Sequence, residues 1–281
     1  MTFKEVLDEA TNHLKKHDVE EASNSAWQLM EFVWRINRSY YFAHSDDIIK
    51  DREKTQYMSL VHRRAKHVPL QYITGKAYFM GHTFSVDESV LIPRFDTEVL
   101  VEEVGKLLTR GDTILDICTG SGCIAIALDL ACDQLAVTGV DISPEALAVA
   151  HKNATDLGAK VSFVESDLFA KVTGRYNVIV SNPPYIRTVE LDNLMAEVQE
   201  YEPRLALDGM VDGLHFYRQI VAKAKDFLFE GGYLAFEIGY DQGEALLAMM
   251  SEGGYEDVRV IKDLAGLDRV VIGKIKGKVI E

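Results

Sequence analysis

Hydrophobic residues follow two different spacings along this chain, and the first is helical. Near the N-terminus, apolar side chains recur every three or four positions, at Phe3, Val6, Leu7, Ala10 and Leu14. This spacing is typical of an amphipathic helix, and Thr2 with Glu5 predicts a capping box at its start. Similar patterns predict a second helix around residues 27–34 and a third at about 52–66, which ends before Pro69.

The second spacing begins at Ile114, where short apolar runs alternate with helical segments. The runs are Ile114–Ile117, Val137–Val140, Val161–Val164, Val178–Ser181 and Tyr233–Ile238. Alternating strands and helices of this kind predict a doubly wound, Rossmann-like parallel sheet in an α/β domain. Two further runs, Val258–Ile261 and Arg269–Ile272, have no clear helix between them, so we expect them to form an antiparallel pair that completes a mostly parallel, seven-stranded sheet.

A short segment separates the two patterns. Residues 78–80 and 83–86 flank Gly81 and His82, which predicts a β-hairpin. We therefore divide the chain into a helical domain at 1–75, a hairpin linker at 76–92 and an α/β domain at 93–281. The helical domain lacks cofactor features, and we expect it to recognise the substrate.

Composition narrows the class of protein. The chain has 281 residues, of which 47% are hydrophobic and 26% charged, as in ordinary globular proteins. We find no apolar stretch long enough to span a bilayer and no signal-peptide pattern at the N-terminus. The three cysteines, Cys118, Cys123 and Cys132, fit neither a zinc site nor a disulfide framework. We expect a cytoplasmic protein with no metal and no membrane association.

The negative charge is concentrated in the second part of the chain. Residues 1–90 hold 12 Lys and Arg against 13 Asp and Glu, so residues 91–281 account for −13 of the net −14. Affinity for nucleic acid depends largely on neutralising phosphates, which an acidic domain does not do. The charge distribution therefore favours a protein partner and no direct nucleic-acid substrate.

A glycine-rich turn follows the first strand of the α/β domain and predicts a nucleoside-binding site. Gly120 and Gly122 allow the backbone to turn tightly and to approach a ligand closely. Asp141 ends the second strand, 19 residues after Gly122, where its carboxylate can accept hydrogen bonds from ribose hydroxyls. The third strand ends at 166–168, a position that can cover an adenine edge. The two cysteines beside the turn, Cys118 and Cys123, are expected to pack as small apolar side chains.

The most informative motif is Asn182-Pro183-Pro184-Tyr185, which directly follows the apolar run Val178–Ser181. Two consecutive prolines stop the strand and keep the chain stiff. The Asn182 side chain and neighbouring backbone carbonyls can then form a rigid acceptor for an NH2 group on a planar, conjugated carbon, and Tyr185 can stack on that group. Such a cradle is suited to methylating an amide or an exocyclic amine.

An NAD-dependent dehydrogenase is the main alternative for the glycine-rich turn. Residues 120–125 fit the dinucleotide pattern G-x-G-x-x-A, with an acidic residue about 20 positions on. A dehydrogenase would need an acid/base for hydride transfer, but His151 and His215 fall at surface positions of predicted helices. It would also have no use for Asn182–Tyr185. The ordered set of motifs favours S-adenosylmethionine as cofactor.

These motifs, in this order, resemble the HemK-type release factor glutamine N5-methyltransferases, and the resemblance covers essentially the whole chain. It extends to Ile92–Glu98, Glu202–Leu207, Asp212–Leu214 with Phe216–Arg218, Glu237–Gly239 with Gln242, and Asp263–Gly266 with Asp268 and Arg269. The resemblance implies a class I S-adenosylmethionine-dependent methyltransferase with a small helical N-terminal domain. It also implies methyl transfer to the amide nitrogen of the glutamine in the Gly-Gly-Gln motif of class I peptide chain release factors.

The resemblance also implies roles for individual residues. Asn182, Pro183 and Tyr185 would be catalytic, and the same three with Pro184 would hold the substrate glutamine. The cofactor would contact Cys118, Thr119, Gly120, Ser121, Gly122, Asp141, Asp167, Leu168 and Asn182.

The chain departs from the family pattern at a few positions. Phe95 replaces a usual proline, Met210 and Val211 replace a Gly-Glu pair, and Leu168 stands where an aromatic residue can occur.

Two other functions fit parts of this pattern. A DNA or RNA amino-methyltransferase acting on adenine N6 meets the same conjugated NH2 group, but the acidic domain and the lack of a basic stripe disfavour it. A non-catalytic adaptor that keeps the fold is disfavoured by the complete cradle and by Asp141.

Overall fold

The computed structural model describes residues 1–276, and within these the chain forms two compact units. Unit 1 comprises Met1–Lys76 together with Met195–Tyr201, and unit 2 comprises the remaining described residues. Each unit is described separately below. None of the helices among residues 1–276 is long and apolar enough to cross a membrane.

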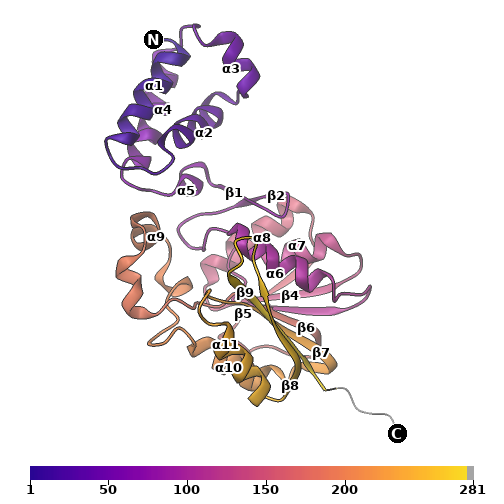
Figure 1. Ribbon diagram of the computed structural model, residues 1–281. Helices are drawn as coiled ribbons and strands as arrows, with labels where there is room; N and C mark the ends of the chain where they lie inside the picture. The colour runs from indigo at the N-terminus through magenta and orange to yellow at the C-terminus, as the bar shows by residue number, and fades with distance from the viewer. Residues whose placement is uncertain (277–281) are drawn as a thin grey trace. The chain divides into compact units, whose positions relative to one another are not determined.

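Unit 1 is built from short helices. Its helices are α1 (Phe3–Lys15), α2 (Ala22–Trp34), α3 (Arg38–His44), α4 (Asp51–Arg64), α5 (Leu70–Thr74) and α9 (Ala196–Tyr201) (Figure 1). The predicted capping box is present: Glu5 N donates to Thr2 Oγ1 at 3.2 Å, and Thr2 N donates to the Glu5 carboxylate at 2.9 Å. The apolar stripe of α1 is buried, as its spacing predicted.

The segment 195–201 joins unit 1 although it is distant in the sequence. Arg64 Nη1 donates to Glu197 Oε2 at 2.8 Å, and Tyr201 Oη donates to the Lys66 carbonyl at 2.7 Å. The Arg64 side chain is only 6% exposed. Nothing in the local hydrophobic pattern of this segment predicted its place in the helical unit.

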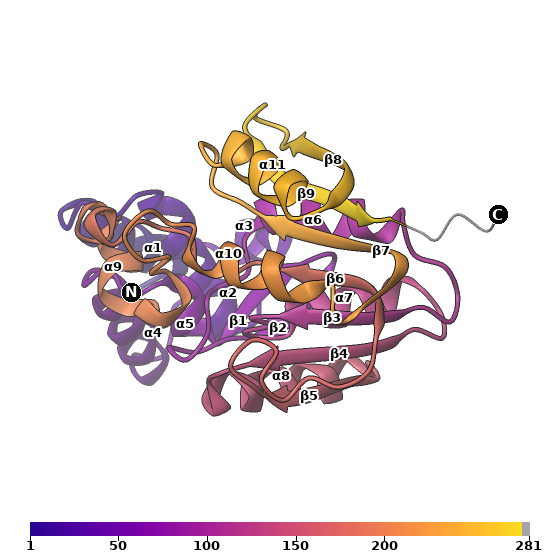
Figure 2. The same cartoon turned by 90° about the horizontal axis from the view of Figure 1, so that it is seen from below.

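Unit 2 contains a two-stranded and a seven-stranded sheet. The small sheet pairs β1 (Lys76–Phe79), whose first residue belongs to unit 1, with β2 (His82–Ser85), where the hairpin was predicted. The large sheet has the order β5-β4-β3-β6-β7-β9-β8 (Figure 2). Its strands are β3 (Thr113–Ile117), β4 (Ala136–Asp141), β5 (Val161–Glu165), β6 (Tyr176–Ser181), β7 (Leu228–Glu237), β8 (Tyr255–Lys262) and β9 (Asp268–Ile275).

The sheet confirms the predicted fold class. The pairs from β5 to β7 are parallel, whereas β9 runs antiparallel to both β7 and β8. All seven predicted strands are present, including the terminal antiparallel pair. The domain limits at residues 75 and 92 stay predictions about function, since compactness alone assigns no role to a segment.

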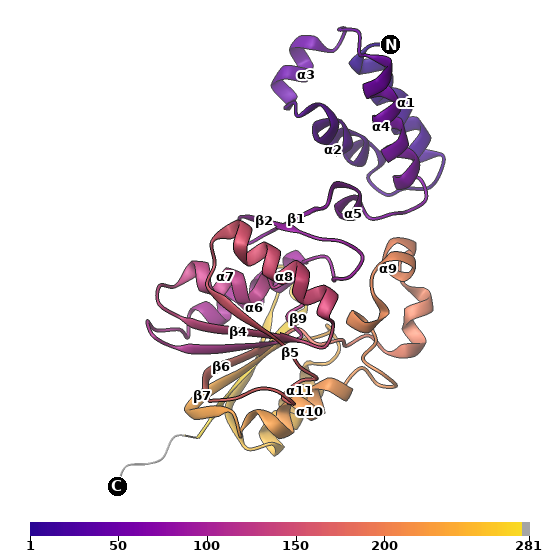
Figure 3. The ribbon, with the colours of Figure 1, turned by 180° about the vertical axis from the view of Figure 1, so that it is seen from behind.

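Helices cover both faces of the large sheet. One face carries α6 (Phe95–Gly105), α7 (Cys123–Ala131) and α8 (Pro144–Leu157), and the other carries α10 (His215–Ala224) and α11 (Gly243–Glu252) (Figures 1 and 3). Successive strand residues enter opposite cores: Ile114 packs in the first cluster and Leu115 in the second. Strands buried on both faces explain the continuous apolar runs in the sequence.

The connection between β6 and α10 is irregular. It includes the 3₁₀ turns at Thr188–Asn193 and Arg204–Ala206, with α9 between them. All the residues from Asn182 to Leu214, apart from 195–201, belong to unit 2. This long connection leaves the carboxyl end of β6, where ligands bind in sheets of this type.

We predict that Glu197→Ala destabilises unit 1 by about 1.5–3 kcal/mol, the range for a hydrogen bond to a charged group. The substitution leaves the nearly buried Arg64 guanidinium with contacts only to Ser25 Oγ and the Val68 carbonyl among the described residues. Urea unfolding followed by tryptophan fluorescence reports on this unit, because both tryptophans, Trp27 and Trp34, lie in it.

The matched control is Glu200→Ala, which removes an exposed carboxylate from the same helix. We expect it to change stability by less than about 0.5 kcal/mol. Equal unfolding midpoints for the two variants would show that the Arg64–Glu197 contact does not stabilise the unit.

Candidate active site

A hollow of about 560 Å³ opens at the carboxyl ends of β3, β4, β5 and β6. The strands that follow β3 in the chain, β4 and β5, lie on one side of it, whereas β6 and β7 lie on the other. The hollow therefore lies where the strand order reverses, which is the topological switch point of the sheet. Nine residues predicted to bind cofactor or substrate line it: Cys118, Thr119, Gly120, Ser121, Asp141, Asp167, Leu168, Asn182 and Pro184. These nine residues lie up to 66 positions apart in the sequence and meet in one cavity.

The glycine-rich turn after β3 is tightly wound. Cys118, Gly120 and Gly122 have φ values of +61°, +54° and +78°. A positive φ is costly for a residue with a Cβ, and such strain is common at functional sites. Thr119 N donates to the Val140 carbonyl at 3.0 Å, which holds the turn against the end of β4.

Asp141 is fixed by backbone donors. Its Oδ2 accepts from Gly120 N at 2.9 Å, and its Oδ1 accepts from Ser143 N at 3.0 Å. Burial raises the pKa of this carboxyl, whereas the bonds from Ser143 and Gly120 lower it. Each carboxylate oxygen can accept a further hydrogen bond, so Asp141 can still bind two hydroxyl groups in the hollow.

A second carboxyl, Asp116, supports the turn from below. It is fully buried, and burial raises its pKa to about 7. Its Oδ2 accepts from Thr119 Oγ1 at 2.6 Å and from Ala125 N at 3.3 Å, which links the turn to the first turn of α7. Burial also raises the pKa of the Cys118 and Cys123 thiols, the latter to about 12, as expected for cysteines that pack rather than react.

The third wall of the hollow comes from the turn after β5. Ser166 N donates to the Asp141 carbonyl at 2.9 Å, and Ser166 Oγ donates to the Leu168 carbonyl at 2.9 Å. Leu168 has a φ of +45°, so it too occupies the left-handed region. Asp167 is exposed beside it. The turn places an apolar side chain and a carboxylate at one end of the cavity.

The Asn182–Tyr185 segment is held at several points. Asn182 Nδ2 donates to Thr97 Oγ1 at 3.4 Å, and Tyr185 Oη donates to Glu237 Oε1 at 3.3 Å. Gln242 Nε2 donates to the Tyr185 carbonyl at 3.1 Å. The segment is therefore fixed through both side chains and backbone.

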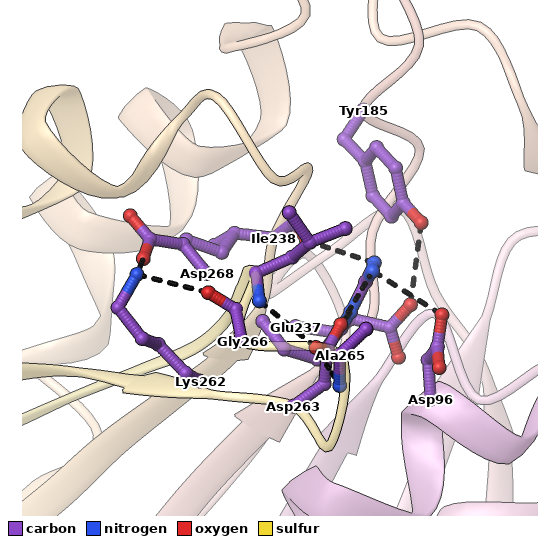
Figure 4. Close-up of polar contacts among 11 residues, drawn as sticks. Asp96, Tyr185, Glu237, Ile238, Lys262, Asp263, Ala265, Gly266 and Asp268 are labelled. Atoms are coloured by element: carbon purple, nitrogen blue, oxygen red, sulfur yellow. Dashed lines mark hydrogen bonds and ion pairs between the residues drawn. The ribbon is translucent and has the colours of Figure 1, made fainter.

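Glu237 lies in a network of charged groups at the end of β7. Arg269 Nη2 lies 3.2 Å from Asp96 Oδ2 and 3.1 Å from Asp263 Oδ2. Figure 4 shows Tyr185, Glu237 and Asp96 converging from the segment after β6, from β7 and from α6. Burial raises the pKa of Glu237, while the nearby Thr97 hydroxyl, the charge of Arg269 and the hydrogen bond from Tyr185 lower it.

The backbone after Pro184 packs closely against residues 207–213. Ile186 N donates to the Leu207 carbonyl at 3.0 Å, and Gly209 N donates to the Ile186 carbonyl at 2.8 Å. A Cβ at Gly213 would collide with the Tyr185 carbonyl oxygen, and Gly213 has a φ of +75°. Only glycine allows this approach.

Not every predicted site residue lies in the wall of the hollow. Within residues 1–276, Gly122, Pro183 and Tyr185 are not among the lining residues. Gly122 packs behind the turn, where a Cβ would meet Ile126 at 3.0 Å, and the Tyr185 hydroxyl binds Glu237. The sequence assigned no role to five residues that line the hollow or bind Tyr185. Arg94, Thr97 and His215 line the hollow, and Glu237 and Gln242 bind Tyr185. An acidic residue at the end of a buried apolar strand was the available signal for Glu237.

Comparisons with known proteins find relatives over nearly the whole chain. Residues 5–75 match the family model of the PrmC N-terminal domain, and residues 93–209 match that of the methyltransferase small domain. The chain is 44% identical to a release factor glutamine methyltransferase of Geobacter sulfurreducens, over 98% of this chain and 97% of that protein. It is 40% identical to one of Moorella thermoacetica, over 96% and 97%.

A solved structure of a Pyrococcus furiosus methyltransferase shares the fold. It is 21% identical, with a TM-score of 0.52, and the match covers 69% of this chain and 89% of that chain.

We predict that Gly213→Ala lowers stability by about 1–3 kcal/mol more than Gly158→Ala, and that thermal unfolding followed by circular dichroism detects the difference. Gly158 is the matched control because its φ is +73°, yet a Cβ there would meet nothing within 4 Å. Both variants carry the cost of a left-handed alanine, roughly 1–2 kcal/mol. Identical midpoints would mean that the contact with Tyr185 is easily relieved.

Proposed function

We infer the reaction of this protein from its family and its site: the chain belongs to the release factor glutamine methyltransferases. It is an S-adenosylmethionine-dependent methyltransferase that acts on the side-chain amide nitrogen of glutamine. The observation that supports this reaction best is that Asn182 lines the same hollow as the glycine-rich turn and Asp141. The proposed amide acceptor and the proposed nucleoside-binding turn thus line a single cavity.

The residues of the hollow fit S-adenosylmethionine. Its volume of about 560 Å³ is within the usual range of roughly 300–1,000 Å³ for ligand pockets. Asp141, with its backbone donors already in place, is suited to the ribose hydroxyls. Leu168 offers an apolar surface for a base, and Asp167 a carboxylate beside it. The tight turn at Cys118–Gly122 lets the backbone come close to the ligand.

When bound, the cofactor supplies an electrophilic methyl group on a sulfonium sulfur. The chain's own residues must then aim the amide nitrogen, which is a poor nucleophile because its lone pair is delocalised into the carbonyl. With Asn182 Nδ2 bound to Thr97, Asn182 Oδ1 is the atom left to accept a hydrogen bond from the substrate amide. The Pro183 carbonyl is the second proposed acceptor.

Two acceptors on the amide hydrogens direct the lone pair and stabilise positive charge as it develops. The nitrogen–methyl bond would form as the sulfur–methyl bond of the cofactor breaks, and the surplus proton would leave the nitrogen for water. Orientation of this kind is worth roughly 7–11 kcal/mol in well-placed intramolecular reactions. Pro184 and Tyr185 complete the proposed substrate site, Pro184 as part of the wall and Tyr185 as its support.

The proposed partner is a class I peptide chain release factor, whose Gly-Gly-Gln loop would present the glutamine. The net charge of −13 over residues 91–281 supports a protein over a nucleic acid. The glycines of such a loop let its backbone approach Pro183 and Pro184 without side-chain clash. A duplex base would instead have to leave its stack at a cost of a few kcal/mol.

We expect methyl groups from labelled S-adenosylmethionine to appear on one glutamine of a full-length class I release factor, as N5-methylglutamine identified by mass spectrometry. Replacing that glutamine should abolish incorporation. Asn182→Ala should lower turnover by at least about 10²-fold, the scale of one oriented polar contact in a transition state. Label that resists protease but disappears with nuclease would point to a nucleic-acid substrate instead.

We also expect Asp141→Ala to weaken S-adenosylmethionine binding by about 1.5–3 kcal/mol in calorimetry, because it removes charged hydrogen bonds. Glu252→Ala is the control, since it changes the net charge equally at an exposed position of α11. Unchanged affinity in Asp141→Ala, or equally tight binding of NAD to the native protein, would remove the basis for the cofactor assignment.

A further inference from the structure

One buried side chain joins the β-hairpin to the glycine-rich turn. Asn153, in the second half of α8, is 1% exposed. Its Oδ1 accepts a hydrogen bond from Ser85 N at 2.7 Å, and its Nδ2 donates to the Ser85 carbonyl at 3.0 Å and to the Ser121 carbonyl at 2.9 Å. Ser85 is the last residue of β2, and Ser121 lies between the two glycines of the turn. A single amide group therefore bridges two segments that are distant in the sequence.

The three hydrogen bonds allow the Asn153 amide only one orientation. Its NH2 group has two hydrogens, and both are directed at carbonyl oxygens, which can only accept. The amide oxygen must therefore face the Ser85 N–H, which can only donate. Ser85 is bound through both its N–H and its carbonyl, as a residue can be bound by a neighbouring strand of a sheet. Asn153 thus extends the pairing of β2 and binds the turn with the same group.

The face of α8 that carries Asn153 also packs against the turn. Ala150 lies three residues earlier, on the same face of the helix. A Cβ built at Gly122 would lie 3.1 Å from the Ala150 Cβ. Asp141 Oδ2 accepts from Gly120 N, whereas Asn153 donates to the carbonyl of the next residue, Ser121. The turn is therefore held by a donor from α8 and by an acceptor from the end of β4.

The chain that leaves the hairpin enters the wall of the hollow. Ser89, Val90 and Leu91 line it, a few residues after Ser85. Asn153 is not itself a lining residue within the part of the chain that the structure describes. It can therefore influence a ligand in the hollow only through the hairpin and the turn that it holds.

We propose that Asn153 is a positioning residue for the cofactor-binding turn, and that it makes the β-hairpin part of the cofactor site. This inference rests on the proposed function, in which the turn contacts S-adenosylmethionine. A turn whose Ser121 carbonyl is already fixed does not have to be ordered by the ligand, which favours binding. By linkage, a ligand that favours the ordered turn must equally favour the ordered hairpin.

The variant Asn153→Ala removes all three hydrogen bonds and leaves every lining residue in place. We expect the Kd for S-adenosylmethionine, measured by calorimetry, to rise roughly five- to tenfold, because the net effect of one neutral hydrogen bond corresponds to about tenfold at most. At saturating cofactor, kcat should change less than about twofold, as expected when only binding is weakened. A residue that merely stabilises the fold would lower Tm and the calorimetric stoichiometry but leave Kd unchanged.

Asn177→Ala is the matched control for losing an asparagine that binds neighbouring backbone. Asn177 Oδ1 accepts from Thr113 N at 2.9 Å and from Thr113 Oγ1 at 3.0 Å. Thr113 begins β3 and Asn177 lies near the start of β6, so this contact is at the opposite end of these strands from the hollow. The control should lower Tm but change the Kd for S-adenosylmethionine less than about twofold.

Hydrogen exchange tests the coupling in the native protein, so it does not depend on the folding of a variant. Saturating S-adenosylmethionine should slow exchange of the Ser85 amide by at least about threefold, and Asn153→Ala should abolish this protection. Unchanged exchange at Ser85 in the native protein would overturn the inference, as would a native Kd for Asn153→Ala. If the native protein binds no S-adenosylmethionine, the cofactor assignment itself fails, and the two failures are therefore distinguishable.

Discussion

A carboxylate with almost no access to water constrains this active site. Glu237 sits at the end of β7, the parallel strand beside β6, and an isolated charge there would be strongly disfavoured. The positive charge of Arg269 and a hydrogen bond from the Tyr185 hydroxyl favour the ionised form of this carboxylate. Because Tyr185 belongs to the segment after β6, its hydrogen bond to the buried carboxylate also fixes that segment. Buried ionic groups often contribute little to stability. The buried Glu237 is therefore better explained by conformational specificity, that is, by the single conformation that it favours for the segment it binds.

The remainder of the site follows from strand topology. Parallel strands end at the same edge of the sheet, and the order β5-β4-β3-β6 brings the glycine-rich turn, Asp141, Leu168 and Asn182 to one hollow. The turn is held from below by Asp116 and from the side by the Val140 carbonyl. The segment after β6 is held by Gln242 and by the close approach of Gly213. Both halves of the site are therefore fixed by polar contacts beneath them, which leaves their ligand-facing atoms available.

The sequence predicted much of this arrangement, because much of it is local. Seven strands were placed from short apolar runs, and the turn with Asp141 from the spacing that nucleoside-binding sheets require. The segment 195–201 could not be placed, since its link to Arg64 joins residues more than 130 positions apart. Thr97 resembles an ordinary residue of a helix first turn, and its hydrogen bond with Asn182 joins positions 85 apart in the sequence. Tyr185 is expected to stack on the substrate, and nothing in the sequence indicates that its hydroxyl binds Glu237, 52 positions later. Motif spacing locates residues that contact ligands, but residues that orient them are visible only once the chain is folded.

The orientation of the Asn182 amide is the central claim, and neutron diffraction of the deuterated protein measures it directly, because deuterium positions distinguish nitrogen from oxygen. We predict two deuterons on the Asn182 atom that faces Thr97, and none on the other atom of the amide, which is then available to accept from the substrate. An Asn182 carbonyl oxygen facing Thr97 would contradict it.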